Sequence, residues 1–257
     1  HYRDVVRTYT QGMDVEVVGD AAVDATLDDL VAQVDGDTAC VIVQSPNFLG
    51  QIEQLDGLAG RIRARDQKTL LAVVTNPISL GLLEPPGHYG ADIVLGDGQP
   101  LGLGLNFGGP YLGFYATRMD YVRQMAGRVV GQTTDAAGET GYVMTLTTRE
   151  QHIRRDKATS NICTNQGLMA LAATVYLSTL GKHGLRRIAE LNYHKAHYAA
   201  AQIDRLDGFA VRADRPFFNE FVVDCPAPVA EINRHLMDSD PRILGGYDLG
   251  SDFAGWD

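Results

Sequence analysis

The chain has 257 residues, of which 45% are hydrophobic, so it is long and apolar enough to bury a sizeable core and is not a disordered polypeptide. Its 32 acidic and 22 basic residues give a net charge of −10, which argues against a nucleic acid partner held by a general positive field. The longest apolar run, 168–180, is shorter than the roughly 20 residues that a membrane span needs, so no membrane partner is expected.

Helical and strand patterns alternate through the first 120 residues. Helical periodicity predicts helices at 3–11, 27–34 and 52–65, and the second has Thr26 as N-cap with Asp29 at position N3. Short apolar or β-branched runs predict strands at 15–18, 39–43, 70–74, 91–95 and 111–116. Because strands that alternate with helices form a largely parallel, twisted sheet, the sequence predicts an α/β fold.

The second half of the chain begins with two β-rich stretches between residues 129 and 148, which predict an antiparallel arm on the surface. Long helices are predicted at 168–180, ending at Gly181, and at 185–206, ending near Gly208. Strands at 209–212 and 218–223 and a helix at 229–237 are typical of a small α+β domain. We therefore expect a large α/β domain with an interdomain helix over 1–207 and a small domain over 208–257.

Glycines are concentrated between residues 96 and 110, directly after a predicted strand. A dinucleotide-binding fingerprint needs G-x-G-x-x-G at the start of a helix, whereas here Gly102 and Gly104 are followed by Gly108, and Pro110 leads into a strand. The spacing therefore disfavours nicotinamide binding and favours a tight loop that is covered by packing.

Cysteines and histidines give no metal-binding pattern. Cys40, Cys163 and Cys225 lie far apart, which favours free thiols in a reducing, cytoplasmic compartment. His194 and His197 are three residues apart on a predicted helix, but no nearby carboxylate or cysteine completes a site. We expect both histidines at the surface and no bound metal.

Basic residues gather between 149 and 157, just before the polar stretch 158–166 that begins the long apolar helix. Free backbone N–H groups at such a helix start attract anions. A solvated helix face is the other interpretation, since Glu150 and Arg154 have the spacing of an ion pair on one helix face, as do His152 and Asp156. From spacing alone the solvated face is favoured.

Residues 149–166, REQHIRRDKATSNICTNQ, resemble the signature of glycine decarboxylase P-proteins. Similarity to the alpha subunit (subunit 1) of the two-subunit form extends over QSPNFLG (44–50), SLGLLEPPG (79–87), DGQPLG (97–102), FGGPYLGF (107–114) and FFNEF (217–221). The resemblance implies an aspartate-aminotransferase-like, type I pyridoxal-phosphate fold. It further implies an enzyme that decarboxylates glycine and passes the aminomethyl group to the lipoyl group of the H-protein, in a chain that lacks N- and C-terminal segments of the family.

The resemblance places a Schiff-base lysine near Gln99 or Pro100 and an acid facing the pyridinium nitrogen near Asn76, where alpha subunits usually have aspartate. The four lysines, Lys68, Lys157, Lys182 and Lys195, all lie outside the glycine-rich loop. Since neither Gln99 nor Pro100 can form a Schiff base, we expect a degenerate pseudo-site without catalytic residues. Pyridoxal phosphate is then bound covalently by a beta subunit.

Three functions remain open: an alpha subunit that completes the enzyme with its beta partner, a complete pyridoxal-phosphate enzyme that uses Lys157, and a non-catalytic assembly or regulatory protein that kept the fold. The residues expected to face the partner and bind anionic groups are Arg149, His152, Arg154, Arg155, Lys157, Thr159, Ser160, Asn161 and Thr164.

Overall fold

A four-stranded sheet forms the centre of the computed structural model, which describes residues 2–19, 25–158, 160, 166–212, 214–253 and 256. Strands β1 (Cys40–Gln44), β2 (Leu70–Val74) and β3 (Ile93–Asp97) run parallel, and β4 (Gly113–Thr117) pairs antiparallel with β3. The α/β prediction is confirmed, and the sheet is mixed because its last strand is reversed.

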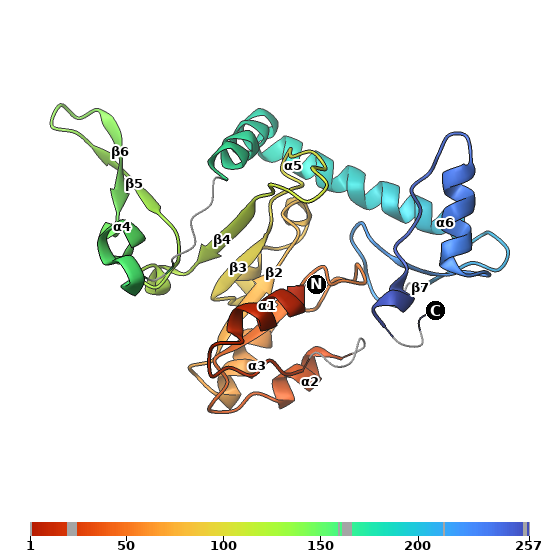
Figure 1. Cartoon of the computed structure of the whole chain (residues 1–257), viewed down its shortest axis with the longest axis horizontal. Helices are drawn as coiled ribbons and strands as arrows, with labels where there is room; N and C mark the ends of the chain where they lie inside the picture. Colours follow the sequence, from red (N-terminus) through yellow and green to blue (C-terminus); the bar gives the residue numbers. More distant parts are fainter. Residues whose placement is uncertain are drawn as a thin grey trace.

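Two helices, α2 (Leu27–Ala32) and α3 (Leu58–Arg65), cover one face of this sheet, while α1 (Tyr2–Thr10) precedes them (Figure 1). The predicted cap of α2 is confirmed: Thr26 Oγ1 accepts the N–H of Asp29 at 3.2 Å, and the Asp29 carboxylate accepts the N–H of Thr26 at 2.9 Å. The core between the helices and the sheet consists of Val31, Val34, Val41, Val43, Leu55, Leu58, Ala59, Ile62, Leu71, Val73 and Ala91.

A long helix, α5 (Gly167–Ile203), runs from above the sheet towards the C-terminal part of the chain (Figure 1). It is interrupted at Gly181, whose φ of 58° and ψ of −176° are not helical, so the two predicted helices form one broken element. A second core, Ile78, Leu101, Ala173, Ala189 and Phe218, packs between α5 and the segments that follow the strands. The described helices include none that is long and apolar enough to cross a membrane.

The C-terminal part contains strands β7 (Ala210–Arg212) and β8 (Val222–Asp224), which pair antiparallel, and helix α6 (Val229–Asp238). Its division from the rest of the chain at Asp207 stays a prediction. Short connections are the helix α4 (Gln151–Arg154) and the 3₁₀ helices η1 (Ser79–Gly81), η2 (Pro86–Tyr89), η3 (Met119–Tyr121), η4 (Thr147–Arg149), η5 (Arg155–Lys157) and η6 (Leu249–Ser251).

The predicted surface arm is confirmed. Strands β5 (Val129–Thr134) and β6 (Thr140–Thr145) pair antiparallel over all six residues and form a separate two-stranded sheet. Figure 1 shows this arm standing away from the central sheet, with α4 at its base.

Two predicted elements are wrong. Residues 15–18 form no strand, because β1 pairs only with β2 in the described part of the chain and no further strand lies beside it to supply hydrogen bonds. The helix predicted at 52–65 begins only at Leu58, since the chain before it is extended and the N–H of Ile52 bonds to the carbonyl of Pro216 at 2.8 Å.

Candidate functional site

The parallel strands β1, β2 and β3 all finish at the same edge of the sheet, and each is followed there by a loop. Ligands of open α/β sheets bind outside the carboxyl ends of the strands, so this edge is the candidate site. A cavity of about 80 Å³ lies beside the first two loops and is lined by Ser45, Ile52, Glu53, Leu55, Thr75, Leu80, Leu83, Glu84, Pro86 and Tyr89.

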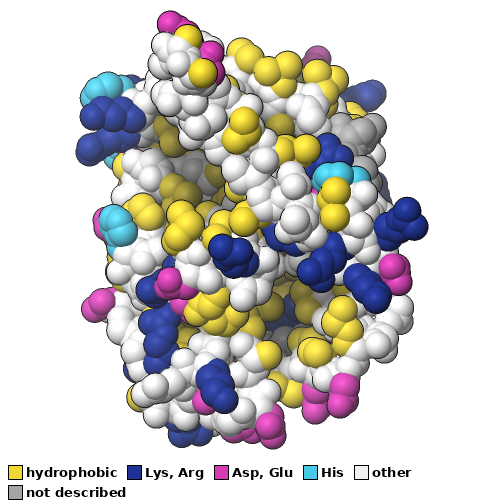
Figure 2. Space-filling view, turned by 90° about the vertical axis from the view of Figure 1, so that its left-hand side faces the viewer, with side chains coloured by type: hydrophobic (Ala, Val, Ile, Leu, Met, Phe, Trp, Pro, Cys, Tyr) yellow, Lys and Arg dark blue, Asp and Glu magenta, His cyan; other side chains and the backbone are white. Residues whose placement is uncertain are grey.

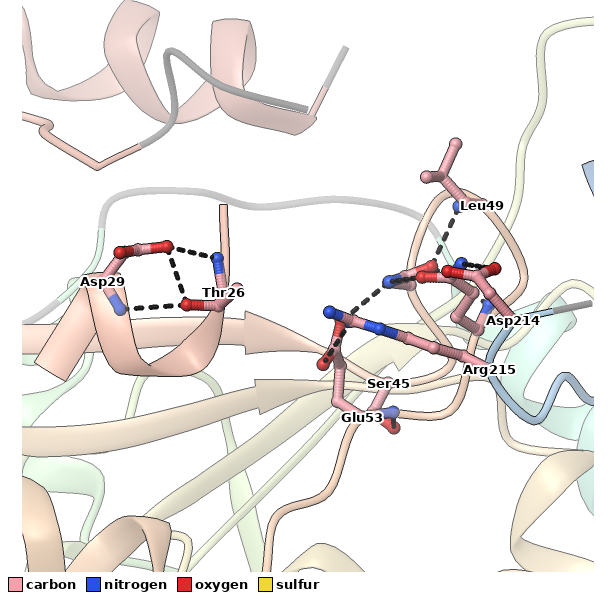
Figure 3. Close-up of polar contacts among 9 residues, drawn as sticks. Thr26, Asp29, Ser45, Leu49, Glu53, Asp214 and Arg215 are labelled. Carbon is pink, nitrogen blue, oxygen red and sulfur yellow. Dashed lines mark hydrogen bonds and ion pairs between the residues drawn. The ribbon is translucent and has the colours of Figure 1, made fainter. Parts of the chain in front are cut away.

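The loop after β1 is folded around the side chain of Asn47. Its Oδ1 accepts the backbone N–H groups of Leu49 and Gln51, both at 3.0 Å, and its Nδ2 donates to Glu53 Oε1 at 2.7 Å. The buried Ser45 hydroxyl accepts the N–H of Glu53 at 3.1 Å (Figure 3). These bonds fix the Glu53 carboxylate at the edge of the cavity.

The same loop is tied to the C-terminal part by two polar contacts. Arg215 Nη1 lies 3.5 Å from the second carboxylate oxygen of Glu53, and Gln51 Nε2 donates to Asp214 at 3.4 Å (Figure 3). The Glu53 side chain is only 14% exposed, so its ion pair with Arg215 is better shielded from solvent than a surface pair. Glu53 therefore links the loop after β1 to the C-terminal part of the chain.

Backbone pairing and ring stacking strengthen this joint. The N–H of Phe218 donates to the carbonyl of Gly50 at 3.2 Å, and Phe218 itself is fully buried. His197 of α5 stacks on the ring of Phe217 at 3.9 Å, with Nε2 3.1 Å from the Phe217 carbonyl. The prediction that His197 is a surface histidine is wrong, because this half-buried ring packs between α5 and residue 217, whereas His194 is exposed.

The predicted pseudo-site residues Asn76 and Gln99 follow β2 and β3, so both belong to the loops at this edge. Asn76 Oδ1 accepts the N–H of Ile78 at 2.9 Å, and Gln99 Nε2 donates to the carbonyl of Leu103 at 2.7 Å. Each amide therefore closes its own turn and supplies neither an amine nor a charge to a ligand.

The glycine-rich loop after β3 packs under α5. Gly102 has a φ of +85°, and a Cβ atom built there would lie 2.7 Å from the ring of Tyr176, so only glycine fits. The prediction of a tight loop covered by packing is confirmed only for this first part of the loop, because Leu105 and Phe107 further along it are 71% and 97% exposed.

None of the four lysines stands on the loops at this edge, and all four are exposed. Lys68 precedes β2 and thus lies at the opposite end of the sheet, Lys157 ends η5, and Lys182 and Lys195 are on α5. The residues of this chain therefore do not fit a covalently held pyridoxal phosphate.

In the basic segment, Arg149 is turned towards its own chain. Its guanidinium donates to the carbonyls of Met125 and of Gly127, the latter at 2.7 Å, and forms an ion pair with Glu150 at 2.9 Å. Both side chains are largely buried, at 10% and 14% exposure. Glu150 is therefore paired with Arg149, and the helix-face pair that its spacing to Arg154 suggested is not present.

The other basic side chains, His152, Arg154, Arg155 and Lys157, are exposed on α4 and η5. Arg155 has a φ of 54°, in the left-handed region that is uncommon for residues other than glycine, and α4 ends there after one turn. Ser160 is half-buried. Of the remaining predicted interface residues, Thr159, Asn161 and Thr164 lie outside the described residues.

Neither a metal-binding cluster nor a reactive thiol is found at the site among the described residues. In the ranges that the structure describes, no cluster of three or more His, Cys, Asp or Glu side chains is placed to hold a metal ion. Cys40 and Cys225 are free, as predicted, and Cys163 lies outside the described residues. Burial raises the pKa of the Cys40 thiol, so this group is protonated and unreactive at neutral pH.

Comparison with known proteins gives consistent matches. The family model of the glycine cleavage system P-protein matches residues 1–239. A probable glycine dehydrogenase (decarboxylating) subunit 1 from Thermomicrobium roseum is 56% identical over 254 residues, which are 97% of this chain and 56% of the relative. The chain thus spans about half the length of the curated relatives it matches.

Solved structures agree. The crystal structure of glycine decarboxylase (P-protein) of the glycine cleavage system, in inhibitor-bound form, has a TM-score of 0.82 at 39% identity and covers 95% of this chain and 55% of that chain. The sphingosine-1-phosphate lyase of Burkholderia pseudomallei has a TM-score of 0.55 at 17% identity, covering 86% of this chain and 47% of that chain, and shows the fold alone. The predicted type I fold of the pyridoxal-phosphate enzymes is confirmed.

Proposed function

Because the chain belongs to the glycine cleavage system P-protein family, we propose that it is part of the first subunit of a two-subunit glycine decarboxylase and works with a second subunit that holds pyridoxal phosphate. The name of the relative, subunit 1, supports the need for a second subunit. The complex would decarboxylate glycine and transfer the aminomethyl group to the lipoyl group of the H-protein. A cytoplasmic location remains a prediction.

The observation that carries this proposal is that polar side chains of the strand-end loops bond within the chain. Asn76 and Gln99 close their own turns, and Glu53 is paired with Arg215, so the edge where a ligand is expected is used for internal contacts. All four lysines are exposed elsewhere, which supports a Schiff-base lysine on the second subunit.

This chain would contribute the basic segment to the shared site. Arg154, Arg155 and Lys157 are exposed together, in a chain whose net charge is −10. A guanidinium can bind a phosphate or carboxylate through two parallel hydrogen bonds, which is stronger than an exposed helix pair. Arg149 is held by its own chain, so its part in this proposal is to position the segment rather than to bind the anion. His152, Thr159, Ser160, Asn161 and Thr164 complete the proposed contact surface.

The direct test is reconstitution. The full chain is mixed with a second subunit that carries a lysine in its glycine-rich loop, and glycine-dependent exchange of carbon dioxide is measured. We expect activity only in the mixture. We also expect that the chain alone, incubated with pyridoxal phosphate, gives no absorbance band that borohydride traps. A trapped adduct on Lys157 would instead support a complete pyridoxal-phosphate enzyme.

The basic segment is tested by replacing Arg154 or Arg155 with Ala. Each substitution should lower association or turnover by about tenfold or more, which is about 1.4 kcal/mol, without changing the melting of the chain alone. Arg234→Ala, at an exposed arginine of α6, is the matched control and should have no effect. Unchanged assembly and turnover in both variants would mean that the segment is only a solvated surface.

A non-catalytic assembly role predicts a different outcome of the same reconstitution. The chain would then bind the second subunit, but turnover by that subunit would not depend on its presence. Titrating the chain at a fixed concentration of the second subunit separates the two functions, because a shared active site requires activity to saturate at a fixed ratio of the two chains.

A further inference from the structure

Arg155 has a backbone conformation that is unfavourable for any residue with a side chain. Its φ of 54° and ψ of −122° lie outside the regions that are allowed to L-residues. They are the angles of the first central residue of a type II′ turn, a position that glycine normally occupies. Leu146 also has a positive φ, but its φ of 53° and ψ of 30° fall in the small left-handed region. Arg155 is therefore the more strained of the two, and it lies in the segment for which anion binding is proposed.

Hydrogen bonds on both sides hold Arg155 in this conformation. Its own N–H donates to the carbonyl of Gln151 at the end of α4, and its carbonyl accepts the N–H of Ala158 at 3.2 Å, which closes η5. Just upstream, the carbonyl of Glu150 accepts the N–H of Arg154 at 2.8 Å. Backbone strain persists only where the surrounding structure imposes it, and here the junction of α4 and η5 imposes it.

The Arg155 side chain does not stabilise the described part of the chain. It is exposed, and no described residue accepts a hydrogen bond from its guanidinium or forms an ion pair with it. Arg149 is the opposite case, since its guanidinium bonds to two carbonyls and to Glu150. Because glycine at position 155 would relieve the strain, the stability of the described residues does not explain the arginine. A contact with another molecule would explain it.

The surroundings of Arg155 suit an oxyanion. Arg154 and Lys157 are exposed beside it, and Figure 2, which views the molecule from the side of α4, shows Lys and Arg side chains on this face. A guanidinium binds a phosphate or carboxylate through two parallel hydrogen bonds, which require a defined orientation. We infer that Arg155 is the residue with which the basic segment holds an oxyanion of the assembled enzyme, and that its strained backbone orients the guanidinium before binding. The inference rests on the proposed function and names the residue that makes the contact.

The strain is tested on the chain alone by comparing glycine with alanine at two neighbouring positions. Arg155→Gly should have a Tm about 2–4 °C above that of Arg155→Ala, because alanine keeps the strain and glycine removes it. Arg154 is helical, with a φ of −88° and a ψ of −12°, so there the glycine variant should have the lower Tm. Circular dichroism measures the four Tm values. The same order of glycine and alanine at both positions would refute the strain and the inference with it.

The contact is tested in the mixture with the second subunit, by assembly and by glycine-dependent exchange of carbon dioxide. Arg155→Gly should lower assembly or turnover about tenfold or more although it is the more stable chain, as expected when one partner of a charge pair is removed. A purely structural role would not lower activity while raising stability. Arg234→Ala on α6 is the control and should change neither quantity. Full assembly and turnover by Arg155→Gly would overturn the inference and leave the proposed function in place.

The source of the oxyanion is identified by leaving out the cofactor. If it is the phosphate of pyridoxal phosphate, Arg155→Ala weakens assembly only with the cofactor-loaded second subunit; if it is a carboxylate of that subunit, the loss is the same with and without cofactor. If Arg155→Ala instead lowers the Tm of the unmixed chain, the oxyanion lies on this polypeptide and the inference is overturned. If the unmodified chain neither assembles nor supports turnover, the proposed function fails together with the inference.

Discussion

The pair of Arg63 and Asp92 provides a quantitative test of how the sheet is stabilised. Asp92 precedes β3 and is 3% exposed, and both its carboxylate oxygens lie 3.0 Å from Arg63 Nη2. The N–H of Leu71 donates to it at 3.0 Å, whereas Arg118 is more distant, at 3.8 Å. Arg63→Ala therefore leaves a buried carboxylate with one good hydrogen bond.

Removing one partner of a buried pair costs about 3–5 kcal/mol, because the remaining charge is not compensated. Since Arg118 is close enough to compensate in part, we expect the lower end of this range, about 3 kcal/mol. For a chain of this size that corresponds to a fall in Tm of roughly 6–12 °C. Asp92→Asn removes the charge itself and still accepts the N–H of Leu71, so it should cost less.

Urea denaturation followed by circular dichroism measures these effects, and the midpoint should fall without a change of slope. In a double-mutant cycle, Arg63→Ala should cost much less when Asp92 is already Asn. The control is Arg61→Ala, on the same helix, whose ion pair with Asp28 is exposed and should contribute below about 1 kcal/mol. If Arg63→Ala costs no more than Arg61→Ala, the reasoning about burial is refuted.

Two further predictions concern the C-terminal part. Phe218→Ala should destabilise the chain by about 3–5 kcal/mol in the same denaturation assay, because this ring is fully buried in the core beneath α5; a loss below about 1 kcal/mol would contradict it. Hydrogen bonds from Arg212 lower the pKa of the Asp224 carboxyl in the folded chain. The pair therefore stabilises the fold fully above the unfolded pKa of about 3.9. This contribution is lost as the pH falls through the lower pKa of the folded chain. The urea midpoint should therefore fall more between pH 5 and pH 2.5 in the parent chain than in Arg212→Ala. An equal fall in the two chains would contradict the assignment.

Features set by neighbours in the sequence were predictable. The capping box of Thr26 and Asp29 depends on residues three apart, and the arm depends on two β-rich stretches around one turn, so each pattern carries its own contacts. The apolar run 70–74 coincides with β2, because a strand buried on both faces needs no alternation. Residues 15–18 are β-branched apart from Glu16, but no strand of the described residues lies beside them, and composition does not show that difference.

The candidate site was predictable only in part for the same reason. Asn76 and Gln99 could be placed at one edge, because each follows a parallel strand. The hydrogen bond of Gln51 to Asp214 joins residues 163 positions apart, and the contact of Glu53 with Arg215 joins residues almost as distant in sequence. Neither Asp214 nor Arg215 lies in a local motif, so nothing short of the folded chain relates them to the loop after β1.

These distant contacts decide which polar side chains at the strand ends are available to a ligand. In an α/β fold that binds its ligand there, polar side chains on the loops have to remain available to the ligand. Here Asn47 is occupied by the backbone of its own loop and by Glu53, and Glu53 is occupied by Arg215. The contacts of Asn47, Glu53 and Arg215 therefore make this part of the strand-end edge a joint between the loop after β1 and the C-terminal part of the chain.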